Sequence, residues 1–138
     1  RTNPWLYNGT LAIEGGDNLT FYGSYTRGLE DSGIAPESAA NPGEALAASL
    51  TEQIDAGLRY KITPDITLVA GVFEVKKPYF DRDPTNVYAR VGALRHRGVE
   101  VSLSGKPIEG LKIVAGAVLL QARVSGSTVD LGLIGDVI

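Results

Sequence analysis

Residues 53–62 read Gln53-Ile54-Asp55-Ala56-Gly57-Leu58-Arg59-Tyr60-Lys61-Ile62, with an apolar residue at every even position and a polar residue or glycine at every odd one. A period of two residues sends alternate side chains of a β-strand to opposite faces. One face of this strand is therefore suited to an apolar phase and the other to water. Ten residues are long for a soluble strand but suffice to cross a bilayer at a tilt, which favours a membrane barrel.

The composition excludes several classes of function. Thirteen Lys and Arg against 16 Asp and Glu give a net charge of −3, so nucleic acid is not expected as a partner. The absence of Cys excludes disulfides, thiolate metal sites and thiol nucleophiles. With 43% hydrophobic residues in 138, the chain is not a disordered tail. It opens at Arg1 without a leader and has no run of about 18 apolar residues. We therefore expect a piece of a larger protein.

The remaining pattern predicts an all-β fold of about six strands joined as an antiparallel up-and-down meander. Short turns at 15–18, 63–65 and 105–110 alternate with loops at 27–51 and 77–87, and residues 45–50 could form one or two helical turns. Short periplasmic turns and longer extracellular loops are typical of membrane barrels. The aromatic residues Trp5, Tyr7, Tyr25 and Tyr60 fall near strand ends, as in an interfacial belt, although ordinary sandwich-core or surface positions would also account for them. The expected strands are 5–14, 19–26, 52–62, 66–76, 88–104 and 111–124.

No catalytic or metal-binding motif emerges. The single histidine, His96, lies between two arginines and has no cysteine or second histidine to complete a metal site. Asp81 and Asp83 lack the later Gly and Glu ligands of a calcium loop, so a solvated turn is expected there. Phosphate loops and nucleophile elbows are also missing. We expect no enzymatic activity and no cofactor.

Two parts of the chain carry a pattern found in one family. The chain departs from that pattern at position 55, where it has Asp in place of the usual Glu. The change keeps a carboxylate at this position. The first part contains Ser24-Tyr25-Thr26-Arg27-Gly28-Leu29-Glu30, Ala35-Pro36, Ala40-Asn41-Pro42-Gly43-Glu44 and Glu52-Gln53-Ile54-Asp55-Ala56-Gly57-Leu58-Arg59-Tyr60. The second contains Lys77-Pro78-Tyr79-Phe80-Asp81, Gly92, Arg95-His96-Arg97-Gly98-Val99-Glu100-Val101-Ser102-Leu103-Ser104-Gly105 and Gly110-Leu111. Over about residues 18 to 122 the chain resembles the barrel of TonB-dependent outer-membrane receptors, and the siderophore-receptor branch fits best.

The resemblance implies that residues 1–138 form part of a 22-stranded barrel in the bacterial outer membrane, without the plug domain or the C-terminal strand. The parent would import a ferric siderophore or related chelate when a TonB-type energy-transducing complex of the inner membrane acts on the missing plug. Outer-membrane lipid would surround the wall. Exposed aromatic and arginine side chains near the loops are suited to anionic chelates. The candidate ligand-binding residues are Arg27, Tyr79, Phe80, Arg82 and Tyr88.

A segment of six strands leaves two open edges with unpaired backbone groups, so we expect it to self-associate through those edges when isolated. Alternative hypotheses remain at this stage. A soluble β-sandwich for carbohydrate binding or adhesion would fold the strands over a core between two sheets. An outer-membrane hydrolase would need a serine paired with His96. Within the transporter family, vitamin or sugar import is an alternative to iron.

Overall fold

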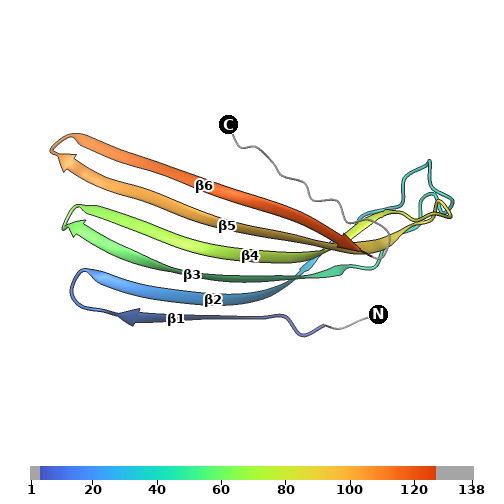
Figure 1. The fold of residues 1–138 in the computed structure, drawn as a ribbon, viewed down its shortest axis with the longest axis horizontal. Helices are drawn as coiled ribbons and strands as arrows, with labels where there is room; N and C mark the ends of the chain where they lie inside the picture. Colours follow the sequence, from blue (N-terminus) through green and yellow to red (C-terminus); the bar gives the residue numbers. More distant parts are fainter. Residues whose placement is uncertain (1–3, 127–138) are drawn as a thin grey trace.

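Six antiparallel strands form one sheet in a computed structural model that describes residues 4–126. Neighbours in sequence are neighbours in the sheet, so the order is β1-β2-β3-β4-β5-β6 (Figure 1). The predicted meander is therefore confirmed. The strands are β1 (Tyr7–Glu14), β2 (Leu19–Glu30), β3 (Ser49–Thr63), β4 (Ile66–Arg82), β5 (Tyr88–Ile108) and β6 (Leu111–Gly126).

Three tight turns join the strands at one end of the sheet, and two longer connections join them at the other (Figure 1). In the β1–β2 turn, Gly15 donates its backbone N–H to the Leu19 carbonyl at 2.8 Å, and Gly16 has a φ of 128°. In the β5–β6 turn, Gly110 has a φ of 82°. Such positive φ values favour glycine because it has no Cβ to clash. These glycines therefore set where the two hairpins reverse.

The strands extend further than the sequence pattern predicted. β2, β3 and β4 continue into residues that we expected to lie in the 27–51 and 77–87 loops, and β5 runs through Pro107 to Ile108. The expected helical turns at 45–50 are also absent, because Ala45 bridges Ile34 and Leu50 belongs to β3. In these added residues backbone pairing continues although the sequence no longer alternates between polar and apolar residues, so the pattern does not reveal the strand ends.

The sheet is a single layer without a hydrophobic core. In residues 4–126 the buried hydrophobic side chains are Ala35, Ala39 and Val124, whereas Leu119 is 71% exposed. A β-sandwich would bury one face of this sheet under another, and the part of the chain that the structure describes forms no second sheet. The sandwich alternative is therefore wrong. β5 alone has 21 residues, far beyond the usual length of a soluble strand.

The register divides the side chains between two faces. We call the face that carries Asp55, Gly57, Arg59 and Lys61 the inner face of the sheet. The opposite face, which carries Ile54 and Leu58, is called the outer face. On the outer face, three successive cross-strand rows contain no charged residue. These rows form an apolar band and are Leu11–Gly23–Ala56–Val72–Val99–Leu119, Ile13–Phe21–Leu58–Ala70–Val101–Ala117 and Leu19–Tyr60–Leu68–Leu103–Ala115.

Aromatic side chains lie at both margins of the apolar band. Tyr60 belongs to the row of this band that is nearest the tight turns. Ile66 and Ile113 lie in the next row toward the turns. Tyr7 and Tyr25 lie beyond the opposite margin, where their rings stack with centroids 5.7 Å apart. Trp5 precedes β1 and is 86% exposed. Tyrosines at the two margins of an apolar band are the arrangement of an interfacial aromatic belt.

The β2–β3 connection packs against the β4–β5 turn. The Asn41 side chain pairs with the backbone of Tyr88, accepting its N–H at 2.8 Å and donating to its carbonyl at 3.1 Å. Asn86, in a left-handed conformation with φ 64°, accepts the Ala40 N–H at 2.7 Å. Two segments more than 40 residues apart are thereby joined at one end of the sheet.

No helix in residues 4–126 is long and apolar enough to cross a membrane.

Isolated residues 1–138 are expected to associate in detergent, because β1 and β6 each have one unpaired edge within residues 4–126. Multi-angle light scattering should give a mass of at least two chains. Ala12→Lys on the edge strand β1 should shift the distribution toward smaller species, since charges on edge strands oppose pairing. A monodisperse monomer of the unaltered segment would refute the expectation.

Asn41→Ala should loosen the β2–β3 connection in the full-length protein. It removes two hydrogen bonds to Tyr88, each worth about 1 kcal/mol. Amide exchange at Tyr88 should accelerate roughly tenfold or more, measured by mass spectrometry. Asn8→Ala on β1 provides the matched control. Unchanged exchange at Tyr88 would mean that other contacts hold the two segments together.

Candidate functional site

On β2, β3 and β5 the inner face of the sheet carries polar, glycine and aromatic residues in register. On β6 the same face carries apolar residues such as Val118 and Leu120. Asp55, Gly57, Arg59 and Lys61, which form the face of the 53–62 strand that is suited to water, belong to this face. A closed barrel of this kind turns its polar face to the interior. Their neighbours on the same face include Thr20, Tyr22, Ser24 and Thr26 of β2, Gly71 and Phe73 of β4, and Gly98, Glu100 and Ser102 of β5.

Large inner-face side chains lie across glycines of the adjacent strands. A Cβ built at Gly57 would approach the Tyr22 hydroxyl to 2.6 Å, and one at Gly71 would approach it to 2.9 Å. Phe73 covers Gly98 in the same way. Aromatic rings that cover cross-strand glycines replace the side-chain contact that glycine lacks. The rings thus lie against the wall instead of projecting from it.

The inner face also holds fixed charges. The Ser24 hydroxyl donates to Asp55 Oδ1 at 2.6 Å, and Gln53 Nε2 donates to the same oxygen at 3.3 Å. Nearer the tight turns, Arg59 and Lys61 line a depression of about 470 Å³ together with Glu14 and Asp17. Both signs of charge meet there, so this end of the inner face is suited to a polar partner surface.

The five predicted ligand-binding residues do not form one cluster. Arg27 belongs to β2, where its Nε lies 3.9 Å from Glu52 Oε1. The other four gather where β4 and β5 meet, with Arg82 paired to Tyr88 and Phe80 paired to Arg90. Four of them were expected in loops, yet Arg27, Tyr79, Phe80 and Arg82 lie on strands, and Tyr88 is the first residue of β5. The strands extend because backbone pairing continues past the apolar band.

Tyr79 and Phe80 have different surroundings. Tyr79 lies opposite Gly92, on the inner face, and donates its hydroxyl to Asp81 Oδ2 at 3.2 Å. Phe80 lines a depression of about 610 Å³ that also involves Leu29, Pro78 and Arg90. Pro78, Lys76 and Leu29 belong to the outer face. The pairing of β4 with β5 shifts by one residue between these two positions, since Tyr79 pairs with Gly92 and Phe80 pairs with Arg90.

A compact turn fixes the end of the β4–β5 hairpin. Asp83 Oδ1 accepts bonds from the Thr85 hydroxyl at 2.6 Å, the Thr85 N–H at 2.8 Å and the Val87 N–H at 3.0 Å. The bond from the Thr85 hydroxyl, followed by that from the Val87 N–H, lowers the pKa of Asp83. Because the folded-state pKa is depressed, this contribution to the turn is present at neutral pH and is lost as pH falls through the lowered pKa.

The sequence pattern did not reveal which residues join the β2–β3 connection to the β4–β5 turn. Asn41 and Asn86 carry the contacts between them. Both occur in turn signals, Asn41-Pro42-Gly43 and Asp83-Pro84-Thr85-Asn86. These signals indicate turns, but nothing in them specifies that the two turns meet.

His96 lies on the inner face between Val75 and Ala122. Within residues 4–126 no group of three or more His, Cys, Asp and Glu residues is placed to hold a metal ion.

Comparison with known proteins places this geometry in a family. The model of the TonB-dependent receptor-like β-barrel matches residues 2–133. The chain is 36% identical over 55 residues to the ferrichrome receptor FcuA of Yersinia enterocolitica, a match that covers 39% of this chain and 7% of FcuA.

Two solved structures share the fold. BauA, the ferric preacinetobactin receptor of Acinetobacter baumannii, is 29% identical with a TM-score of 0.68, over 86% of this chain and 18% of BauA. The ferric-catecholate import receptor Fiu of E. coli K12 has a TM-score of 0.72 at 14% identity, over 88% of this chain and 18% of Fiu. The chain thus spans less than a fifth of each of these relatives.

The predicted siderophore-receptor resemblance is therefore confirmed at the level of the fold and its relatives. The family is one of outer-membrane transporters rather than enzymes. The chain that forms this six-stranded wall belongs to the TonB-dependent receptor-like β-barrel family.

Proposed function

We propose that this chain is wall and loop structure of an outer-membrane receptor that imports a ferric siderophore with energy from the inner membrane. The observation that carries the proposal is the 29% identity to a ferric preacinetobactin receptor over 86% of the chain. The local match to a ferrichrome receptor supports it. The wall would close with the rest of a 22-stranded barrel around a plug, on which a TonB-type complex acts.

The inner face fits this role. Tyr22 and Phe73 lie against cross-strand glycines, which leaves room for a domain inside the barrel. The depression with Glu14, Asp17, Arg59 and Lys61 offers both signs of charge to that domain. Water can hydrate a polar interface when its two surfaces separate, so such an interface suits a plug that must move during transport.

Ligand contact is proposed at the end of the β4–β5 hairpin. Tyr79 is the strongest candidate because it lies on the inner face and is oriented by Asp81. Phe80, Arg82 and Tyr88 remain predicted ligand contacts, because they lie at the same end of the hairpin as Tyr79. Arg27 is the least favoured, because it lies two strands away beside Glu52. Aromatic and cationic groups at this rim suit an anionic chelate.

Uptake of radioactive iron by cells that express the full-length receptor tests the transport proposal. The cells lack other siderophore receptors, and the panel includes ferrichrome, ferric preacinetobactin and a ferric catecholate. We expect one chelate to support uptake and a proton uncoupler to abolish it. Cells with the empty vector are the control. No uptake from any chelate, together with uptake of a vitamin or sugar, would assign a different cargo.

Tyr79→Ala in the full-length receptor should raise the half-saturating chelate concentration roughly three- to tenfold, because an aromatic contact contributes about 0.5–1.5 kcal/mol. The maximal uptake rate should hold, since energy coupling is untouched. Tyr60→Ala, on the outer face near the tight turns, is the matched control. Equal effects of the two variants would place ligand contact elsewhere.

A further inference from the structure

The outer face carries charge at the end of the apolar band nearest the long connections. The row next to the band, Gly9–Tyr25–Ile54–Glu74–Arg97–Gln121, holds one carboxylate and one arginine. The next row, Tyr7–Arg27–Glu52–Lys76–Arg95–Arg123, holds four cations and one carboxylate. We call these two rows the outer charged belt. Together they carry a surplus of three positive charges.

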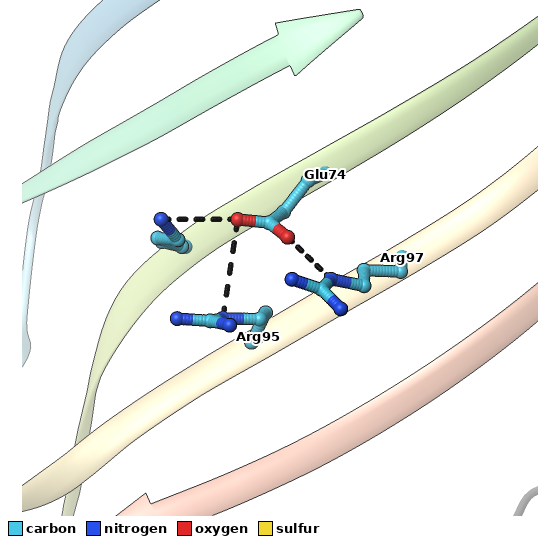
Figure 2. Close-up of polar contacts among 4 residues, drawn as sticks. Glu74, Arg95 and Arg97 are labelled. Atoms are coloured by element: carbon cyan, nitrogen blue, oxygen red, sulfur yellow. Dashed lines mark hydrogen bonds and ion pairs between the residues drawn. The ribbon is translucent and has the colours of Figure 1, made fainter.

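Glu74 lies at the centre of the belt, where its carboxylate contacts three cations. Oε1 lies 3.0 Å from Lys76 Nζ and 3.9 Å from Arg95 Nε, and Oε2 accepts a bond from Arg97 Nε. Figure 2 shows Arg95 and Arg97 extending from neighbouring positions of one strand toward Glu74 on the next. One negative charge is thus shared among three positive ones, and two of those charges remain uncompensated.

The cations are more exposed than the carboxylate that positions them. The side chain of Glu74 is 18% exposed and that of Arg97 is 57% exposed. The carboxylate therefore lies beneath guanidinium and ammonium groups that keep free N–H donors. Arg123 lies directly opposite Arg95 on β6, which adds a fourth cation to the same patch. Two arginines side by side repel each other unless an anion lies between them.

An apolar depression adjoins these cations. About 340 Å³ of space is lined by Ile54, Ala56 and Val72, and also by Glu74 and Arg97. All five residues belong to the outer face. Cationic donors therefore meet apolar surface at one level of the wall. An amphiphile with an anionic head and an acyl tail complements both parts.

The ion pairs within the outer charged belt do not stabilise the fold enough to explain why these charges are there. Exposed ion pairs contribute little, and a surplus of like charges next to a lipid-facing band costs energy. An anion from the membrane would remove that cost. Phosphate is favoured over carboxylate because clustered arginines bind its several oxygens with forked, charge-assisted hydrogen bonds.

We propose that Lys76, Arg95, Arg97 and Arg123 bind a phosphate group on the head of a membrane lipid, with Glu74 positioning three of these cations. The lipid tail lies along Ile54 and Val72 toward the apolar band. The site faces away from the barrel interior, so it is separate from chelate transport. It gives the wall a specific lipid contact at one boundary of the bilayer.

The test uses the full-length receptor in non-ionic detergent, with bound lipid counted by native mass spectrometry. Phosphatidic acid and diacylglycerol with identical acyl chains are titrated separately, because they differ only in the phosphate. We expect phosphatidic acid to bind at least tenfold more tightly. The double variant Arg95→Gln/Arg123→Gln should weaken that binding roughly tenfold or more, since bonds to charged groups are the stronger kind. Arg95→Lys/Arg123→Lys should retain more of it than the Gln variant.

Lys106→Gln/Lys112→Gln is the matched control, because it removes two cations near the other ends of β5 and β6. Its affinity for phosphatidic acid should be unchanged. Equal affinities for the two lipids on the unaltered receptor would overturn the proposal without reference to any variant. Equal losses in the belt and control variants would do the same. Displacement of phosphatidic acid by an equal concentration of inorganic phosphate would indicate a site for the free ion instead of a lipid.

Discussion

Backbone hydrogen bonding between neighbouring antiparallel strands is the constraint on which this structure depends. The sheet has no core to hold it, since the buried hydrophobic side chains of residues 4–126 are two alanines in a connection and one valine. In lipid, every unpaired N–H or C=O costs several kcal/mol, so each strand must pair along its whole length. Continuous pairing from β1 to β6 meets this requirement inside the wall. The two outermost edges require neighbours of their own.

The pairing register converts an alternating sequence into two surfaces. Direct partners share a face, so one charged residue on the inner face of β3 aligns with polar residues on β2. Ser24 and Asp55 meet in this way. The same rule aligns Glu74 with Arg97 and Lys76 with Arg95 on the outer face. A shift by one residue would exchange the two faces, which explains why tight turns with positive-φ glycines matter to the whole wall.

Much of the fold could be predicted from sequence, but the candidate sites could not. Residues 53–62 alternate clearly because lipid and water lie on opposite sides of β3, so the number and order of the strands and the facing of β3 followed from the pattern. The pattern stops at Glu52 and at Lys76, where charged residues occupy the outer face as well, and there the strand ends were misplaced. Arg27 and Phe80 were therefore expected in loops although they lie on strands. The meeting of Asn41 with Tyr88 joins positions 47 residues apart, a separation at which turn signals carry no information.

The outer charged belt shows which features can be predicted from the sequence pattern and which depend on how the strands pair. The alternation of polar and apolar residues was enough to predict a membrane wall, because the period of two is set by local backbone geometry. That cations of β4 and β5 surround Glu74, with Arg123 of β6 opposite Arg95, became visible only in the folded sheet. Those neighbours depend on cross-strand register, which turns and bulges set over many residues, and no single strand contains that information.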